Sequence, residues 1–116
     1  MISWENFNEN LQVYGDELVI QVIDMFFEDH QETLNIIQQS IQKKDFPVLR
    51  FNAHHLKNTL SNFMDPVTTQ LCRKLEEMGK NCTEAGMDEA FADLQLAIKL
   101  LSDELYAYRK KLTSPS

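Results

Sequence analysis

The feature that most constrains the fold is a long apolar repeat near the C-terminal end of the sequence. Apolar residues recur there at alternating intervals of four and three: Met87, Phe91, Leu94, Ile98, Leu101, Leu105, Tyr108 and Leu112. This spacing follows the turn of an α-helix and places the apolar side chains along one face. The repeat therefore predicts an amphipathic helix over residues 87–112.

A second stripe with the same spacing lies in the middle of the chain, at Leu49, Ala53, Leu56, Leu60 and Phe63. Asp45 is a favourable N-cap, and Pro47 is tolerated in the first turn of a helix. We expect a helix that begins at this aspartate and ends near Phe63.

The Asp65-Pro66 pair repeats that start signal and predicts another helix, which carries apolar residues inwards at Val67, Leu71, Leu75 and Met78. This helix is predicted to end near Gly79, so that "GKNCTEAG" forms a loop. The remaining charged positions of "RKLEEMGK" are interpreted as an exposed face.

Two further helical segments are expected upstream. Asp16 opens a helical pattern over residues 16–43, which the sequence leaves open as one kinked helix or two. A short N-terminal helix is predicted with Ser3 as its cap and with Trp4 and Phe7 as lid residues.

Together these patterns predict an all-α fold, with no competing strand pattern. Four long amphipathic helices joined by short loops favour an antiparallel up-and-down four-helix bundle, here with a short N-terminal helical extension. We expect residues 1–112 to form a single domain and residues 113–116 a flexible tail.

Charge and composition disfavour several classes of function. The chain has 18 acidic and 11 basic residues, and its net charge of −7 disfavours nucleic acid and acidic membrane surfaces as partners. No signal peptide and no apolar run of about 20 residues are visible, so we expect a cytoplasmic protein without a membrane span. Cys72 and Cys82 are too few for a disulfide framework.

The stretch "FNAHHLKNTLSNFM", residues 51–64, holds a histidine pair on the second predicted helix. At about 100° per residue, the two imidazoles diverge and cannot grip one metal ion together. His54 shares a polar strip with Arg50, Lys57 and Ser61, whereas His55 lies on the other side. Only His54 therefore has a cation close to its imidazole.

A neutral imidazole presents a nitrogen lone pair to an electrophile, and a cation beside it suits phosphoryl transfer. Acyl transfer would need an oxyanion hole and an orienting carboxylate, and neither is obvious on this surface. No inward-facing E-x-x-H pairs are present, which disfavours a metal enzyme, and we expect no metal or cofactor.

The segments "AHHLKN" and "LCRKLEEMGK" resemble the signature of the histidine-containing phosphotransfer (HPt) domain, whose pattern begins A-H-x-[LI]-K-G. The match in the following helix is at Leu71, Cys72, Leu75 and Glu76, and the resemblance covers most of the chain. It implies a four-helix bundle in which His54 accepts the phosphoryl group and Lys57 helps to hold it. His55 fills a variable slot, and Cys72 is interpreted as a small core residue.

Two positions depart from the family pattern. Asn58 replaces the glycine after the lysine, and Met64 replaces a second glycine. The amide of Asn58 either crowds the approach to His54 or hydrogen-bonds to the imidazole or phosphoryl group, and the sequence leaves both open. Asp65-Pro66 can end the helix without the second glycine.

The resemblance predicts a monomeric phosphorelay protein without catalytic activity of its own. It would take a phosphoryl group from the aspartyl phosphate of a receiver domain in a response regulator or hybrid histidine kinase, and pass it to another receiver. The expected docking surface includes Arg50, Phe51, Asn58, Ser61 and residues 30–43, with Phe51 partly exposed. The alternative is a helical adaptor that docks a signalling partner without phosphorylation.

Overall fold

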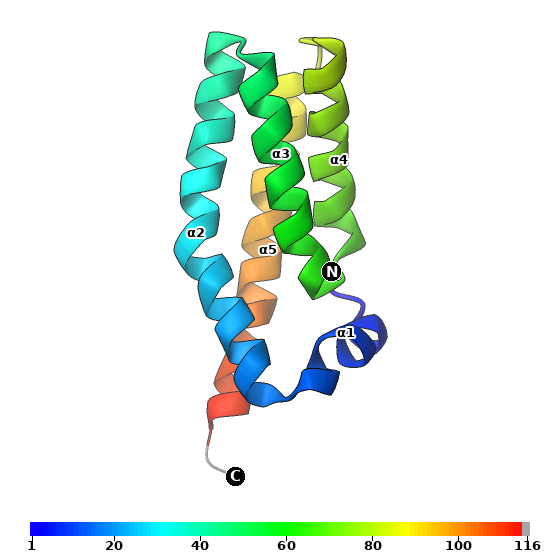
Figure 1. The fold of residues 1–116 in the computed structure, drawn as a ribbon, viewed down its shortest axis with the longest axis vertical. Coiled ribbons are helices and arrows are strands. Elements are labelled where there is room, and N and C mark those ends of the chain that lie inside the picture. The colour runs from blue at the N-terminus through cyan, green and yellow to red at the C-terminus, as the bar shows by residue number, and fades with distance from the viewer. Residues whose placement is uncertain (115–116) are drawn as a thin grey trace.

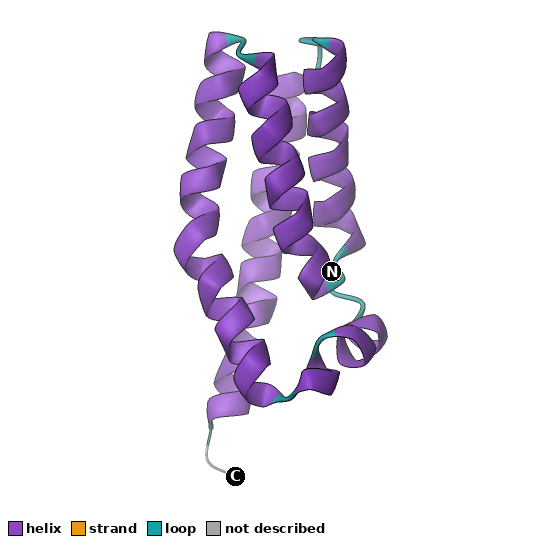
Figure 2. Ribbon diagram, in the orientation of Figure 1, coloured by secondary structure: helices purple, strands orange, loops and turns teal. Residues whose placement is uncertain are grey.

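The structure, a computed structural model, describes residues 1–114 and is helical almost throughout (Figure 2). Its α-helices are α1 (Trp4–Asn10), α2 (Asp16–Lys43), α3 (Phe46–Leu60), α4 (Pro66–Asn81) and α5 (Met87–Thr113). Short 3-10 turns follow α1 and α3, at Gln12–Tyr14 and Ser61–Phe63. No strand occurs among the described residues, which confirms the predicted all-α class.

Four long helices lie side by side, as Figure 1 shows for α2, α3, α4 and α5. The α2–α3 and α4–α5 connections lie at one end of the molecule and the α3–α4 connection at the other. α1 lies near this second end, where the Ser3 N–H donates to the Met64 carbonyl over 2.8 Å. The resulting body is elongated, with extents of 50 × 23 × 19 Å.

Aspartate caps set where α3 and α4 begin, as the sequence predicted. The Asp45 carboxylate accepts from the Val48 N–H, and that of Asp65 accepts from the Val67 and Thr68 N–H groups. Each bond satisfies a donor that the helix itself leaves unpaired. The two caps agree with the predicted starts of α3 and α4.

Ser3 occupies the N-cap position of α1 but does not cap its backbone with its side chain. Its hydroxyl instead accepts a hydrogen bond from the Asn6 amide over 3.0 Å. The predicted lid also differs, because Phe7 is fully buried in the core. Trp4 is the covering residue, with its ring 5.1 Å from that of Phe7 and 4.8 Å from that of Tyr108.

Residues 16–43 form the single helix α2, which resolves the alternative that the sequence left open. The helix ends at Lys44 in the left-handed conformation, with φ of 56°. An ion pair links α2 to α5, the two longest helices. Arg109 of α5 donates two hydrogen bonds to the Asp24 carboxylate of α2, over 2.6 and 3.0 Å.

α4 ends close to the predicted position near Gly79, but the loop that follows is shorter than predicted. The helix continues to Asn81, and the loop is confined to residues 82–86. A Cβ atom at Gly79 would lie 3.2 Å from both the Arg50 nitrogen and the Phe46 carbonyl oxygen. The glycine therefore lets the backbones of α3 and α4 approach each other, and it does not terminate the helix.

Met64 sits at φ of 55°, in the left-handed region that glycine adopts most readily. This position follows the turn that ends α3, one residue before the Asp65 cap of α4. Met64 thus adopts the left-handed conformation that suits the glycine of the HPt pattern, although it carries a side chain.

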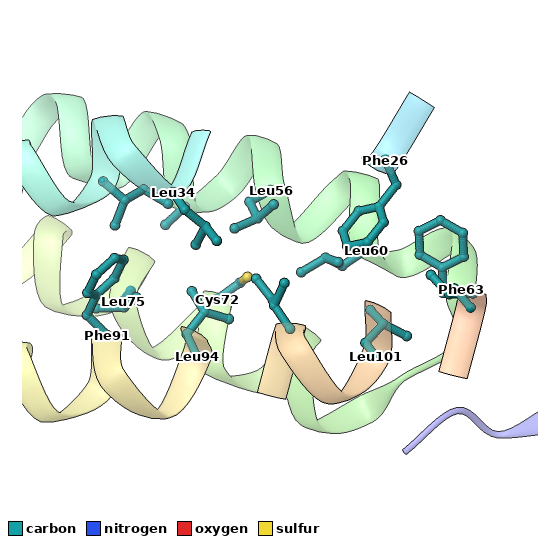
Figure 3. Packing of buried hydrophobic residues seen from close by; sticks show 14 of the residues in the cluster. Phe26, Leu34, Leu56, Leu60, Phe63, Cys72, Leu75, Phe91, Leu94 and Leu101 are labelled. Atoms are coloured by element: carbon teal, nitrogen blue, oxygen red, sulfur yellow. The ribbon is translucent and has the colours of Figure 1, made fainter. Parts of the chain in front are cut away.

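One continuous apolar core runs through the bundle, as the close view in Figure 3 shows. α3 and α4 contribute fully buried side chains that include Leu56, Leu60, Cys72 and Leu75. Phe26 of α2 meets Phe63 edge-on at 5.3 Å and closes the core near the α3–α4 connection. The expectation that Cys72 is a small core residue is confirmed.

The C-terminal helix extends one residue past the predicted limit of the domain, to Thr113. Of the predicted flexible tail, residues 115 and 116 lie outside the described residues. Within residues 1–114, no helix is both long enough and apolar enough to cross a membrane.

Candidate functional site

His54 lies on the α3 surface that borders α4, with its side chain 53% exposed. Its Nδ1 atom lies 2.8 Å from Oε1 of Glu76 on α4, although the two residues are 22 positions apart. Lys57, one turn further along α3, donates to Oε2 of the same carboxylate over 2.9 Å. One carboxylate therefore joins the two residues that the sequence had singled out.

Glu76 is a candidate site residue whose contacts the sequence did not predict. Its carboxylate is only 19% exposed and is held between two partners, which corrects the interpretation of this stretch as a uniformly exposed charged face. The finding also corrects the statement that no orienting carboxylate is obvious here. The close approach of the helices at Gly79, one turn away, brings α4 within reach of these α3 side chains.

The ionisation of Glu76 fixes which nitrogen of His54 is free. Burial by itself raises the pKa of this carboxyl, but hydrogen bonds from Lys57 and His54 outweigh that effect and leave its pKa below the ordinary value. An ionised carboxylate only accepts hydrogen bonds, so Nδ1 of His54 must donate. In a neutral imidazole the lone pair is then on Nε2, which is the nucleophilic nitrogen.

Lys57 is less exposed than its expected role as a surface cation implied. Only 19% of its side chain is accessible, and its ammonium contacts Glu76. Before any reaction, this lysine therefore holds the carboxylate that orients His54.

Cys72 lies beneath this surface as a fully buried thiol. Burial raises its pKa to about 12, an effect that the nearby Lys57 only partly opposes. The thiol stays protonated at neutral pH and has no nucleophilic role.

A shallow hollow opens beside His54 and is lined by Pro47, Arg50, Phe51, His54 and Glu76. Phe51 is 73% exposed, so the prediction that it is accessible is confirmed. The imidazole thus stands at the edge of an open surface with an aromatic ring and a guanidinium beside it.

A comparison with protein-family models finds the Hpt domain over residues 21–108 of the chain. The chain belongs to the Hpt domain family. This match covers well over half of the sequence and includes all of α3 and α4, the helices that build the site. No curated protein and no solved structure matches the chain.

Asn58 occupies the position of the glycine in the Hpt pattern, and its side chain is exposed. Within residues 1–114 this side chain makes no hydrogen bond, so it does not hold the imidazole of His54. The Ser61 hydroxyl donates to the Lys57 carbonyl over 2.7 Å and is engaged with its own helix. Of the predicted strip, His54 and Lys57 contact Glu76, and Arg50 lines the hollow with His54 and Glu76.

His55 diverges from His54, as the helix geometry predicted. It borders a cavity between α2 and α3 that is also lined by Phe26, Asp29 and His30, and it does not share the hollow of Phe51. His30 stacks on Phe26 at 4.4 Å and lies 2.8 Å from the Phe26 carbonyl through Nδ1. No cluster of three or more metal-ligating side chains occurs among the described residues.

Proposed function

We propose that this Hpt domain is a phosphorelay intermediate that accepts a phosphoryl group on Nε2 of His54 from a receiver domain and returns it to another receiver. The observation that carries the proposal is the contact of Nδ1 with the Glu76 carboxylate at 2.8 Å. It leaves Nε2 as the nitrogen with the lone pair, on a side chain that is half exposed.

The transfer is a displacement at phosphorus. The Nε2 lone pair of His54 forms the new N–P bond, and the bond between phosphorus and the aspartyl oxygen of the receiver breaks. Its electron pair returns to the receiver carboxylate, while the Nδ1 proton stays in the hydrogen bond to Glu76. The imidazole gains positive charge in this step, and the adjacent carboxylate stabilises that charge.

The same groups serve the reverse step, in which another receiver's carboxylate attacks phosphorus and Nε2 leaves with its electron pair. The resemblance to the family implies that the partner supplies the acidic pocket and the Mg²⁺ ion. The Hpt domain then needs no catalytic activity of its own, and its antiparallel four-helix bundle serves as a rigid mount for the imidazole.

We place the receiver on the surface around His54, over α3 and the neighbouring residues 30–43 of α2. An imidazole on a convex bundle can enter a pocket of the partner, and the exposed Phe51 ring offers apolar contact at the patch edge.

The competing function is an adaptor that docks a receiver without being phosphorylated. Asn58 favours it, because a side chain in place of the family's glycine narrows the approach to the imidazole. The Glu76 contacts oppose it, because docking alone does not require His54 to be oriented.

Phosphorylated receiver domains discriminate between the two functions. The wild-type protein should acquire an acid-labile phosphate, His54→Gln should abolish it, and His55→Gln, the matched control one residue away, should retain it. Labelling that survives His54→Gln would overturn the assignment. A wild-type protein that binds a receiver and remains unlabelled would establish the adaptor.

A further inference from the structure

We infer that Arg50, and not Lys57, supplies the main cationic contact to the phosphoryl group on His54. The inference rests on the proposed function and concerns the phosphorylated state of the same site. It departs from the family-based expectation that the lysine after the histidine holds the phosphoryl oxygens. Three observations on α3 and α4 support it.

The first observation is the side of the imidazole on which each cation lies. Glu76 occupies Nδ1, so the phosphoryl group is attached at Nε2. Lys57 donates a hydrogen bond to the other oxygen of that carboxylate over 2.9 Å. Only 19% of the lysine side chain is exposed. The ammonium of Lys57 is therefore paired with the same carboxylate that accepts the hydrogen bond from Nδ1 of His54.

The second observation is that Arg50 is the cation that lines the hollow beside His54. Helical side chains tilt towards the N-terminus of their helix and cover the preceding turn. On α3 that turn contains Arg50, four residues earlier and about 40° round the helix. Arg50 lines the hollow beside the imidazole together with His54 and Glu76, whereas Lys57 does not line it.

The third observation is that the backbone of Arg50 is held against α4, whereas its guanidinium has no ion-pair partner among residues 1–114. Its backbone nitrogen and Cα pack against α4 at Gly79, where an added Cβ would lie 3.2 and 3.3 Å away. Its side chain is exposed, and within residues 1–114 it forms no ion pair. A guanidinium can donate two parallel hydrogen bonds to phosphoryl oxygens, a geometry that an ammonium cannot match.

The second ionisation of the phosphoryl group is sensitive to such a contact. A bound cation favours its dianionic form and lowers the pH of its second ionisation, which ³¹P NMR follows directly. Phosphoramidate is a suitable small donor: Nε2 attacks phosphorus, the P–N bond of the reagent breaks, and ammonia leaves. The measurement thus needs no receiver domain.

We expect Arg50→Gln to raise the midpoint of this ionisation by about half a pH unit, as suits one exposed charge contact. Arg50→Lys should restore part of the shift. Arg73→Gln, which removes an exposed arginine outside the hollow, should leave the midpoint unchanged, and Lys57→Ala should shift it less than Arg50→Gln.

Equal midpoints in the wild type and Arg50→Gln would overturn the inference and leave the proposed function intact. A larger shift for Lys57→Ala than for Arg50→Gln would return the phosphoryl contact to the lysine. If neither phosphoramidate nor any phosphorylated receiver labels His54 in the wild type, the proposed function is wrong, and the inference is wrong with it.

Discussion

Replacing Glu76 with glutamine should slow phosphoryl transfer without unfolding the protein. The change keeps the size of the side chain and an oxygen that can accept from Nδ1 of His54, but it removes the negative charge. The wild-type carboxylate lies 2.8 Å from Nδ1 of His54 and 2.9 Å from Nζ of Lys57. Both distances are typical of hydrogen bonds to a charged group.

The magnitude follows from these contacts. A hydrogen bond to a charged group contributes about 1.5–3 kcal/mol and a neutral one about 1 kcal/mol. His54 is 53% exposed, so solvent screening favours the lower end of that range. At that lower end the two kinds of bond differ by about 0.5 kcal/mol, and losing this much in the transition state, where the imidazole becomes positive, slows transfer roughly two-fold. The free energy of unfolding should fall by no more than about 1 kcal/mol, because the ion pair is partly exposed.

Single-turnover transfer from one phosphorylated receiver measures the rate, and urea denaturation measures stability. Glu77→Gln is the matched control, since it makes the same change of net charge on an exposed neighbour. Equal rates for the two variants would refute the orienting role of Glu76. So would a rate loss in Glu76→Gln that a stabilising salt or osmolyte fully reverses, because that loss would come from unfolding.

Lys57→Ala should change the free energy of unfolding by less than about 1 kcal/mol and still slow single-turnover transfer, because Glu76 loses the cation that holds it; an unchanged rate would remove Lys57 from the site. Asn58→Gly should speed transfer, since the exposed amide makes no bond to His54 and only narrows the approach; a slower rate would show that the amide holds the phosphoryl group. Gly79→Ala should lower stability by about 1 kcal/mol in urea denaturation, because overpacking against the α3 backbone outweighs the gain in helix propensity; a more stable variant would contradict this account. The stabilising contribution of Glu76 should be present above its unfolded pKa, near 4.5, and should be lost as the pH falls through its lower folded value, a loss that Glu76→Gln should abolish in acid titrations followed by circular dichroism.

The helices themselves were predictable because their signals are local. The aspartate caps at Asp45 and Asp65 and the apolar stripes lie within a few residues of one another, so the sequence alone specifies them. Gly79 shows the limit of such signals. A glycine near the end of an apolar stripe is typical of a helix terminus, but here a close contact with another helix requires it.

The role of Glu76 could not be predicted from the stripes for a related reason. The pattern of a helix fixes each residue's position relative to its own apolar face, but not which positions of two neighbouring helices meet. Glu76 follows the inward-facing Leu75 and therefore lies at the border of the buried face. An acidic residue at one helix border and a basic residue at another, Lys57, were the available signal, and only the packing of α3 on α4 shows that they pair.

The exposure of the site suits the proposed relay, in which the protein both accepts and returns a phosphoryl group. In the proposed reaction, phosphorylation at Nε2 creates a positive imidazole beside Glu76 and a phosphoryl dianion that, in the arrangement inferred here, Arg50 contacts. Because His54 is half exposed, each such contact contributes only about 1 kcal/mol. A deeply buried pair would stabilise the phosphohistidine much more strongly and would oppose its release to the next receiver. In the proposed relay, contacts of this modest strength would orient the imidazole of His54 and still allow the phosphoryl group to leave it.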